Sequence, residues 1–334
     1  MRLTILLFAA LLSASAQAQK ETPVRFALDW RFEGPAAPYL VAIDKGYYKA
    51  EGLNVSIDPG SGSVEGINRV ASGAYDVGFA DINLLVKYRD NPRNLPVKMV
   101  MMVYDTPAFS IITLKKSGIA KPKDLEGRIL GAPAGDGAWA QWPIFVQANK
   151  IDAAKVRVEN IGFPVREPML AQGRVDAITG FWFSSFMNLK ANGIPPSEIV
   201  VLHMRDWGLD LYGNGIVVNP DFMRFSPKAV AGFVKGTIKG IQETLRDPDS
   251  AIESVMKRNP IAKRDVELER LKLSLEKNFV SPDVRKNGLG AIDAKRMERS
   301  IEQIGLTFQY TNKPKVADIF TAQYLPPKEQ RLVK

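Results

Sequence analysis

Short apolar runs alternate with helix-length segments along the first two thirds of the chain. Residues 24–28 and 53–57 have the length and composition of β-strands, and a helical segment that ends at Lys45-Gly46 lies between them. A strand, a helix and a strand within about 35 residues form the minimal unit of a parallel sheet. Because the alternation continues to about residue 218, the pattern predicts an α/β fold.

A sequence echo divides this α/β region into two similar halves. Gly73 ends a predicted helix and Asp76 enters the next strand, and Gly173 and Asp176 do the same 100 residues later. This distance is far too long for a solenoid repeat, so the echo predicts two lobes of similar design.

The last third of the chain is predicted to be helical. Apolar residues recur at helical spacing, and the charged residues between them form solvent faces. The predicted helices cover residues 229–245, 248–257, 264–275 and 293–305, and residues 325–334 are expected to form a tail.

The first 18 residues have the pattern of a secretory signal peptide. Arg2 precedes an apolar run over residues 3–12, and Ala16-Gln17-Ala18 is a small-x-small cleavage pattern. The run is shorter than the roughly 20 residues that span a bilayer. A buried N-terminal helix is the alternative. We expect residues 1–18 to be removed and the mature protein to be exported.

The chain contains no cysteine. Disulfides, thiolate metal sites, cysteine nucleophiles and a lipid-modified N-terminal cysteine are thus excluded. An exported protein of this size without such an anchor fits the periplasm. The net charge of +9 arises from basic residues interspersed with acidic ones, not from a basic stripe, so no nucleic-acid partner is expected.

Few features of the sequence favour catalysis. His203 is the single histidine, so a catalytic triad or a histidine metal site would depend on it alone. No Walker loop, GxSxG elbow or GxGxxG fingerprint is present. Composition does not exclude hydrolysis by paired carboxylates, but no pair stands out by its context. The sequence predicts a protein that is not an enzyme and that uses no cofactor or metal.

Two glycine-rich segments, residues 59–63 and 133–137, each lie between a predicted strand and a helix. Backbone N–H groups at such a helix start can bind an anionic or polar group, or the glycines can serve a tight connection alone. Aromatic residues gather at the same strand ends, and we expect some in the core and others as stacking walls for a flat ligand. These aromatic residues are Trp30, Phe32, Trp139, Trp142, Phe181, Trp182 and Phe183.

Several of these segments together resemble the substrate-binding proteins of ABC importers. The resemblance is carried by Leu28-Asp29-Trp30, by residues 39–42, 45–53, 60–63 and 123–128, and by the two Gly-x-x-Asp motifs. The chain is similar to the branch that contains alkanesulfonate, taurine and nitrate binders and thiamine-pyrimidine-precursor binders. The resemblance implies a two-lobed periplasmic-binding-protein fold (Venus flytrap, type II) with two hinge crossings. It implies lobe one over residues 24–107 and 216–334, lobe two over 108–215, and crossings near 106–108 and 212–215.

The chain departs from the thiamine-pyrimidine binders at two places. It has Phe32-Glu33-Gly34 where those proteins carry Asn and His, and Ser184-Ser185-Phe186 where they place an acidic residue. The related pyrimidine synthases depend on a cysteine-rich motif and an active-site histidine, and this chain has neither. Synthase activity is therefore not expected.

The resemblance implies the solute-binding component of an ABC importer, acting as a monomer with an inner-membrane permease and its ATPase. The expected ligand is a small aromatic or heterocyclic molecule, similar to a thiamine-pyrimidine precursor and held between the lobes. Alkanesulfonate, taurine or nitrate is the alternative ligand. A pyrimidine-synthase-like or hydrolytic enzyme on the same fold is the alternative from another class.

The expected ligand site gathers residues at the strand ends of both lobes. Trp30 and Trp182 are expected to face the ligand, helped by Trp139, and Asp29 or Asp81 to accept a hydrogen bond from an amino group. Hydrogen bonds are also expected from the Ser61 and Ser63 hydroxyls and the backbone at Gly62 and Gly137, and the set is completed by Phe32, Tyr39, Asp136 and Phe181.

Overall fold

The computed structural model describes residues 21–333, so the predicted signal peptide over residues 1–18 lies outside the described residues. Between residues 21 and 333, no helix is both long enough and apolar enough to cross a membrane.

The first of two sheets has the strand order β2-β1-β3-β10-β4. Its strands are β1 (Thr22–Ala27), β2 (Leu53–Asp58), β3 (Val77–Asp81), β4 (Lys98–Met102) and β10 (Asn214–Val218). β1 pairs in parallel with both β2 and β3, which confirms the predicted parallel unit, whereas β10 runs antiparallel between β3 and β4.

The second sheet repeats this plan with the order β7-β6-β8-β5-β9. Its strands are β5 (Phe109–Leu114), β6 (Ile129–Ala132), β7 (Arg157–Asn160), β8 (Ala177–Phe181) and β9 (Ile199–His203). Here too three neighbouring strands are parallel, and β5 runs antiparallel to both of its neighbours.

The Gly-x-x-Asp echo has one structural explanation in both halves. The carboxylate of Asp76 accepts a hydrogen bond from the backbone N–H of Arg25 at 2.8 Å, and the carboxylate of Asp176 accepts one from Ile129 at the same distance. The backbone N–H of each aspartate is also bonded to the carbonyl of the same partner residue. Each aspartate thus fastens the central strand of its sheet, β3 or β8, to the neighbouring parallel strand, β1 or β6.

The chain passes from the first sheet to the second after β4 and returns before β10, so two segments cross side by side. The N–H of Gly213 in the returning segment donates to the carbonyl of Tyr104 in the outgoing one at 3.0 Å. A Cβ at Gly213 would lie 2.9 Å from the Tyr104 backbone oxygen and 3.1 Å from Pro107. Only glycine allows the two segments to approach this closely.

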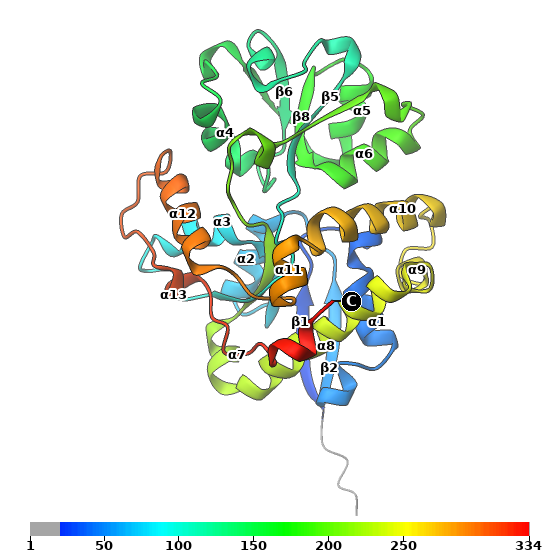
Figure 1. The fold of residues 1–334 in the computed structure, drawn as a ribbon, viewed down its shortest axis with the longest axis vertical. Helices are drawn as coiled ribbons and strands as arrows, with labels where there is room; N and C mark the ends of the chain where they lie inside the picture. The colour runs from blue at the N-terminus through cyan, green and yellow to red at the C-terminus, as the bar shows by residue number, and fades with distance from the viewer. Residues whose placement is uncertain (1–20, 334) are drawn as a thin grey trace, which may run out of the picture.

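The helices cover the two sheets, and the upper and lower bodies of Figure 1 correspond to the second and first sheet. They are α1 (Ala37–Asp44), α2 (Ser63–Ala71), α3 (Ile82–Arg89), α4 (Trp142–Ala148), α5 (Arg166–Ala171), α6 (Trp182–Ala191), α7 (Pro220–Phe225), α8 (Pro227–Arg246), α9 (Pro248–Met256), α10 (Arg264–Ser274), α11 (Pro282–Asn287), α12 (Ala294–Gly305) and α13 (Val316–Ile319). All four helices predicted in the last third are present. α10 continues as a π-helical turn, Leu275–Phe279, and lies against α6 of the upper body.

The C-terminal residues do not form the tail that the sequence suggested. The side chain of Gln242 in α8 donates to the carbonyls of Gln330 and Leu332, at 3.1 and 2.8 Å. The guanidinium of Arg331 donates to the carbonyls of Asn287 and Leu289. These polar contacts hold the segment against α8 and α11. Because they do not depend on a regular spacing of apolar residues, the hydrophobic pattern of the sequence did not indicate them.

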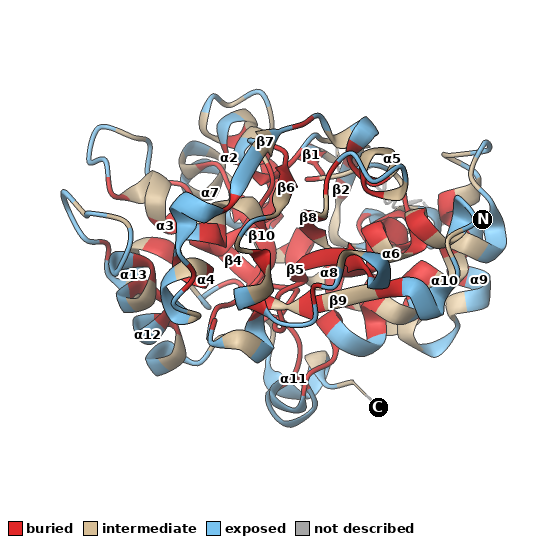
Figure 2. Cartoon of the chain, turned by 90° about the horizontal axis from the view of Figure 1, so that it is seen from above, coloured by how far each residue is buried: buried red, intermediate tan, exposed pale blue. Residues whose placement is uncertain are grey.

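The inner strands of both sheets form the buried interior, drawn in red in Figure 2, whereas the edge strand β7 is largely exposed. In the first sheet, aromatic rings join β1 to its helices: Phe26 packs edge to face on Tyr39 and on Phe233, and Tyr48 stacks on Phe233 at 5.0 Å. This packing fixes the end of β1, which leads into Asp29 and Trp30.

Candidate functional site

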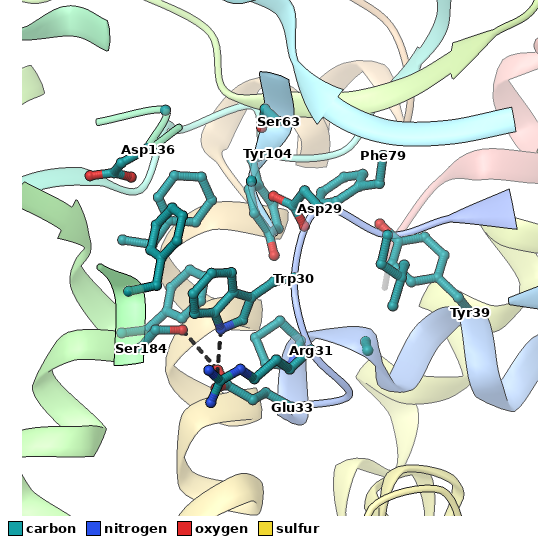
Figure 3. Close-up of a pocket in the computed structure, with 18 of the residues that line it drawn as sticks. Asp29, Trp30, Arg31, Glu33, Tyr39, Ser63, Phe79, Tyr104, Asp136 and Ser184 are labelled. Carbon is teal, nitrogen blue, oxygen red and sulfur yellow. Dashed lines mark hydrogen bonds between the residues drawn. The ribbon is translucent and has the colours of Figure 1, made fainter. Parts of the chain in front are cut away.

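A pocket with an empty volume of about 650 Å³ lies between the carboxyl ends of the strands of the two sheets. In an α/β fold this is the position at which ligands bind. Figure 3 shows its lining side chains, which come from both halves of the molecule. The lining consists of Leu28, Asp29, Trp30, Arg31, Glu33, Pro35, Ala36, Tyr39, Gly62, Ser63, Phe79, Tyr104, Asp136, Gly137, Phe163, Arg166, Phe181, Phe183 and Ser184.

Seven of the nineteen residues that line the pocket carry aromatic rings. They are Trp30, Tyr39, Phe79, Tyr104, Phe163, Phe181 and Phe183. Trp30 follows β1 and Phe163 follows β7, and their rings meet edge to face with centroids 4.8 Å apart. Tyr104 lies edge to face with both Phe181 and Phe183 across the same gap. The walls therefore close around a space suited to a flat apolar body.

One end of the pocket is formed by the carboxyl group of Asp29. Its Oδ2 accepts a hydrogen bond from Nδ2 of Asn214 at 2.7 Å, and the same Nδ2 lies 3.2 Å from the Ser63 hydroxyl. Burial raises the pKa of Asp29 to about 8, and the nearby carboxylates of Asp81 and Glu33 act in the same direction. Asp29 is thus mainly protonated at neutral pH in the ligand-free protein.

The opposite end of the pocket is organised by Glu33. Its Oε1 accepts a hydrogen bond from the Trp30 indole N–H at 3.1 Å, and its Oε2 accepts one from the Ser184 hydroxyl at 3.0 Å, as the dashed lines in Figure 3 show. Oε2 also lies 3.0 Å from the guanidinium of Arg270 in α10. Ser184 belongs to α6, so Glu33 connects the two halves of the molecule beside the pocket.

The second half contributes Asp136 and Arg166. Asp136 accepts hydrogen bonds from the Thr179 hydroxyl at 2.7 Å and from the backbone N–H of Ala138 at 3.2 Å. Burial raises the pKa of Asp136, although the charge of Arg166 opposes the shift. Arg166 is itself paired with Glu167 at 2.7 Å, and both side chains are almost fully buried. The positive charge of Arg166 is therefore already compensated.

Eight of the thirteen residues expected at the site line the pocket: Asp29, Trp30, Tyr39, Gly62, Ser63, Asp136, Gly137 and Phe181. The Gly62 N–H does not point to a ligand, because it donates to the carbonyl of Asp29 at 2.7 Å. Gly62 has φ +104, and a Cβ there would lie 2.6 Å from the carbonyl oxygen of Gly135. This glycine serves a close approach between the two halves.

Three of the other expected residues lie outside the lining for local reasons. Phe32 packs on the core of the first half, and its carbonyl accepts a hydrogen bond from Asn259. Ser61 is exposed, and its backbone N–H donates to Glu65 at 2.7 Å. Trp139 stacks on Trp142 with centroids 6.1 Å apart.

Asp81 and Trp182 also lie outside the lining. The carboxylate of Asp81 caps α3 through the N–H of Leu84 at 2.7 Å, and burial raises its pKa to about 7. The indole N–H of Trp182 donates to Asn278 at 3.1 Å, and the ring packs edge to face on His203. Trp182 therefore packs in the core where α6 meets the π-helical turn.

Several lining residues carried no signal in the sequence. Phe79 lies within a strand that is buried on both faces, and Tyr104 and Phe163 follow strands without a glycine-rich turn. Glu33 is the exception, because it stands in the Pro- and Gly-rich turn after Asp29-Trp30. Because this turn follows the predicted strand over residues 24–28, Glu33 could have been recognised as a candidate site residue from the sequence.

His203 does not line the pocket. Burial lowers its pKa. Among residues 21–333 no three His, Cys, Asp or Glu side chains are grouped in a way that could hold a metal ion.

The chain belongs to the NMT1/THI5 like family, whose model it matches over residues 35–251. It is 28% identical to the riboflavin-binding protein RibY of Chloroflexus aurantiacus, over 87% of this chain and 82% of that protein. It is 27% identical to the formylaminopyrimidine-binding protein of Halalkalibacterium halodurans, over 81% of this chain and 84% of that protein. A 4-amino-5-hydroxymethyl-2-methylpyrimidine phosphate synthase of Aspergillus parasiticus is 23% identical over 71% of each chain.

Solved structures confirm the fold that the sequence resemblance implied. The periplasmic aliphatic sulphonate-binding protein SsuA of Escherichia coli superposes with a TM-score of 0.70 at 12% identity, and the match covers 91% of this chain and 99% of that one. The fold is thus the two-lobed periplasmic-binding-protein fold, and the pocket is the cleft between its lobes.

Proposed function

We propose that this protein is the solute-binding component of an ABC importer and that it captures a neutral heteroaromatic molecule between its lobes. The observation that carries the proposal is the wall of seven aromatic rings contributed by both lobes. Stacked rings add about 0.5–1.5 kcal/mol each beyond the area they bury. A ligand contacted by both lobes stabilises the closed state over the open one.

The polar groups that line the cleft argue against an anionic ligand. Asp29, Glu33 and Asp136 contribute three carboxyl groups to the lining, and the guanidinium of Arg166 is paired with Glu167. Arg31 is exposed and lies 5.4 Å from the Trp30 ring. Moving an anion such as an alkanesulfonate, taurine or nitrate out of water is costly unless a cation compensates its charge. Among the described lining residues, every buried cation is already paired with a carboxylate of the protein.

We propose binding without turnover. Two of the relatives are named as binding proteins, and the single histidine packs away from the cleft, against Trp182. Because other relatives are named as synthases, an enzymatic function is the alternative. Release of chemically unchanged ligand is the behaviour that distinguishes a binder from such an enzyme.

The remaining parts of the proposal concern location and partners. Residues 1–18 act as a cleaved signal peptide and the mature protein works in the periplasm as a monomer. The lobes move as units over residues 24–107 with 216–334 and over 108–215. The closed form is recognised by an inner-membrane permease that works with an ATPase.

The decisive experiment is native mass spectrometry of the protein purified without refolding, followed by calorimetric titration. We expect a small heteroaromatic mass to co-purify or, for ligand-free protein, riboflavin or formylaminopyrimidine to bind. Taurine, nitrate and an alkanesulfonate serve as anionic comparators. Tight binding of a comparator together with no binding of either heteroaromatic probe would contradict the proposal.

A further inference from the structure

Asn214 joins the Asp29 end of the pocket to the hinge. Its side-chain Nδ2 donates to Asp29 Oδ2 at 2.7 Å, and its backbone carbonyl accepts from the N–H groups of Val103 and Tyr104, at 3.1 and 2.8 Å. The residue is fully buried at the first position of β10. The same residue therefore holds both crossing segments and one oxygen of a pocket carboxyl group.

The contact with Asn214 makes the two oxygens of Asp29 unequal. Oδ2 accepts the side-chain N–H of Asn214, whereas no other side chain among residues 21–333 donates to Oδ1; the backbone N–H of Asp29 itself also bonds to the carboxyl group. A carboxyl group that holds one proton keeps it on the oxygen that is not accepting a hydrogen bond. The Asn214 contact therefore favours Oδ1 as the oxygen that carries the proton of Asp29, and Figure 3 shows the Asp29 carboxyl group beside Tyr104.

We propose that Asn214 is a positioning residue that presents Asp29 to the ligand as a hydrogen-bond donor. The cleft then selects ligands with an acceptor at that edge, such as a ring nitrogen or a carbonyl oxygen flanked by an apolar ring system. This inference rests on the proposed function and states which polar group of the ligand the cleft recognises.

The groups that face Asp29 favour its protonated form. Asp81 at the end of β3 and Glu33 in the turn after β1 both repel a negative charge on it. The hydroxyls of Tyr39 in α1 and Tyr104 in the crossing are the other titratable neighbours, and burial holds the pKa of each well above its usual value. The backbone N–H of Asp29 itself acts in the opposite direction and lowers the pKa, and the Asn214 N–H on Oδ2 is a second donor that stabilises the carboxylate.

The first test needs no ligand. The Asp29 carboxyl carbon is followed by NMR during a pH titration of the full mature chain, in the wild type and in Asn214→Leu. Loss of a donor to the carboxylate is expected to raise the Asp29 midpoint by about one unit or more. Asn214→Ser, which adds no bulk, is expected to shift the midpoint in the same direction if the leucine variant folds poorly.

The matched control for this titration is Asn219→Leu. Asn219 lies just after the other end of β10 and is also a buried amide, bonded through Nδ2 to the carbonyl of Val70. Loss of the Asn219 amide disturbs the same strand but removes no contact with Asp29. The midpoint of the Asp29 titration is therefore expected to remain unchanged. An unchanged midpoint in both Asn214 variants, or an equal shift in the control, would overturn the inference.

The second test measures binding of riboflavin and of formylaminopyrimidine between pH 6 and pH 9. If the ligand accepts the proton of Asp29, its binding to the wild type is expected to weaken about tenfold per pH unit above the Asp29 midpoint. In Asn214→Leu, this decline is expected to begin at higher pH. Asp29→Asn keeps a donor, so it is expected to weaken binding by no more than about threefold at neutral pH and to lose the alkaline decline. Asp29→Leu is expected to weaken binding at least tenfold.

The outcomes separate this inference from the proposed function. If Asp29→Asn binds as poorly as Asp29→Leu, the ligand needs a carboxylate acceptor and the inference is wrong. If neither probe binds to wild-type protein, the heteroaromatic assignment of the cleft fails with these compounds, while the NMR titration still decides whether Asn214 controls the Asp29 proton.

Discussion

The indole ring of Trp30 and the phenyl ring of Phe163 meet edge to face across the cleft, with centroids 4.8 Å apart and an angle of 67° between their planes. Trp30 belongs to the lobe of the first sheet and Phe163 to the lobe of the second. Their contact closes one side of the pocket, so the aromatic wall is complete only when the lobes are together.

Trp30→Ala is expected to weaken ligand binding by more than about tenfold, because the ligand loses a stacking surface and the closed state loses the contact with Phe163. The melting temperature is expected to change little. Affinity and thermal unfolding are measured on the same preparation. Trp207→Ala, which removes a half-buried tryptophan outside the cleft lining, is the matched control and should leave affinity near wild type. Comparable binding losses in both variants would contradict a specific role for Trp30.

Trp182→Ala is expected to act on stability. The side chain is buried and its N–H is bonded to Asn278 at 3.1 Å, so truncation should cost about 3–5 kcal/mol of the free energy of unfolding. Trp182→Phe keeps much of the packing and should cost less. Denaturant unfolding measures both variants. A large loss of affinity with an unchanged unfolding midpoint would show that Trp182 contacts the ligand after all.

The hydrogen bond from Ser184 to Glu33 is expected to hold the closed state. Ligand should reduce the radius of gyration of the wild type in small-angle scattering, and Ser184→Ala should need about tenfold more ligand for the same compaction. Glu269→Gln removes the exposed interlobe pair with Lys190 and should change the requirement less than about threefold. Scattering that does not change at saturating ligand would count against hinge closure.

The buried carboxyl groups predict the pH dependence of stability. The pKa of Asp29 is raised to about 8 and that of Asp81 to about 7, both by burial, whereas in the unfolded chain both titrate near 4. The folded protein thus holds protons that the unfolded chain releases, so stability falls as pH rises from about 4 to about 8. The melting temperature of ligand-free protein is expected to drop over this range. Asp81→Asn, which can still cap α3, should flatten the profile, and an unchanged slope would reject this assignment.

Asp76 and Asp176 are expected to stabilise their own lobes. Replacing either by alanine leaves a strand N–H without its carboxylate partner, which typically costs about 1–3 kcal/mol. Hydrogen exchange in Asp176→Ala should increase around β6 and β8 and stay near wild type around β1. Asp76→Ala should show the reverse pattern. Equal changes in both lobes would argue against two independent units.

The order of strands and helices could be predicted because each element has its own local signal. The apolar runs, the glycines that end helices and the Gly-x-x-Asp echo are local patterns, and the structure contains the sheets and helices that they indicated. The ends of strands could also be located, which is why Asp29 and Phe181 were expected where the cleft is found. The polar contacts of Gln242 and Arg331 that dock the C-terminus have no such pattern.

The direction of each side chain could not be predicted in the same way. Phe181, Trp182 and Phe183 are consecutive at the start of α6, yet Phe181 and Phe183 line the cleft and Trp182 packs in the core. Phe181 ends strand β8, whereas Trp182 and Phe183 are the first residues of α6, where successive side chains point about 100° apart, so the directions depend on where the strand ends and the helix begins. Composition gives no information on that angle.

The sequence by itself determined the α/β alternation, the twofold plan of the sheets and the strand ends at which a ligand site forms, because these depend on residues close together in the chain. The tertiary structure decided which groups act together. Asn214 reaches Asp29 from 185 residues away, and Ser184 reaches Glu33 from 151 residues away. The first contact exists because the returning crossing inserts β10 into the first sheet, and the second exists because the two lobes lie against each other.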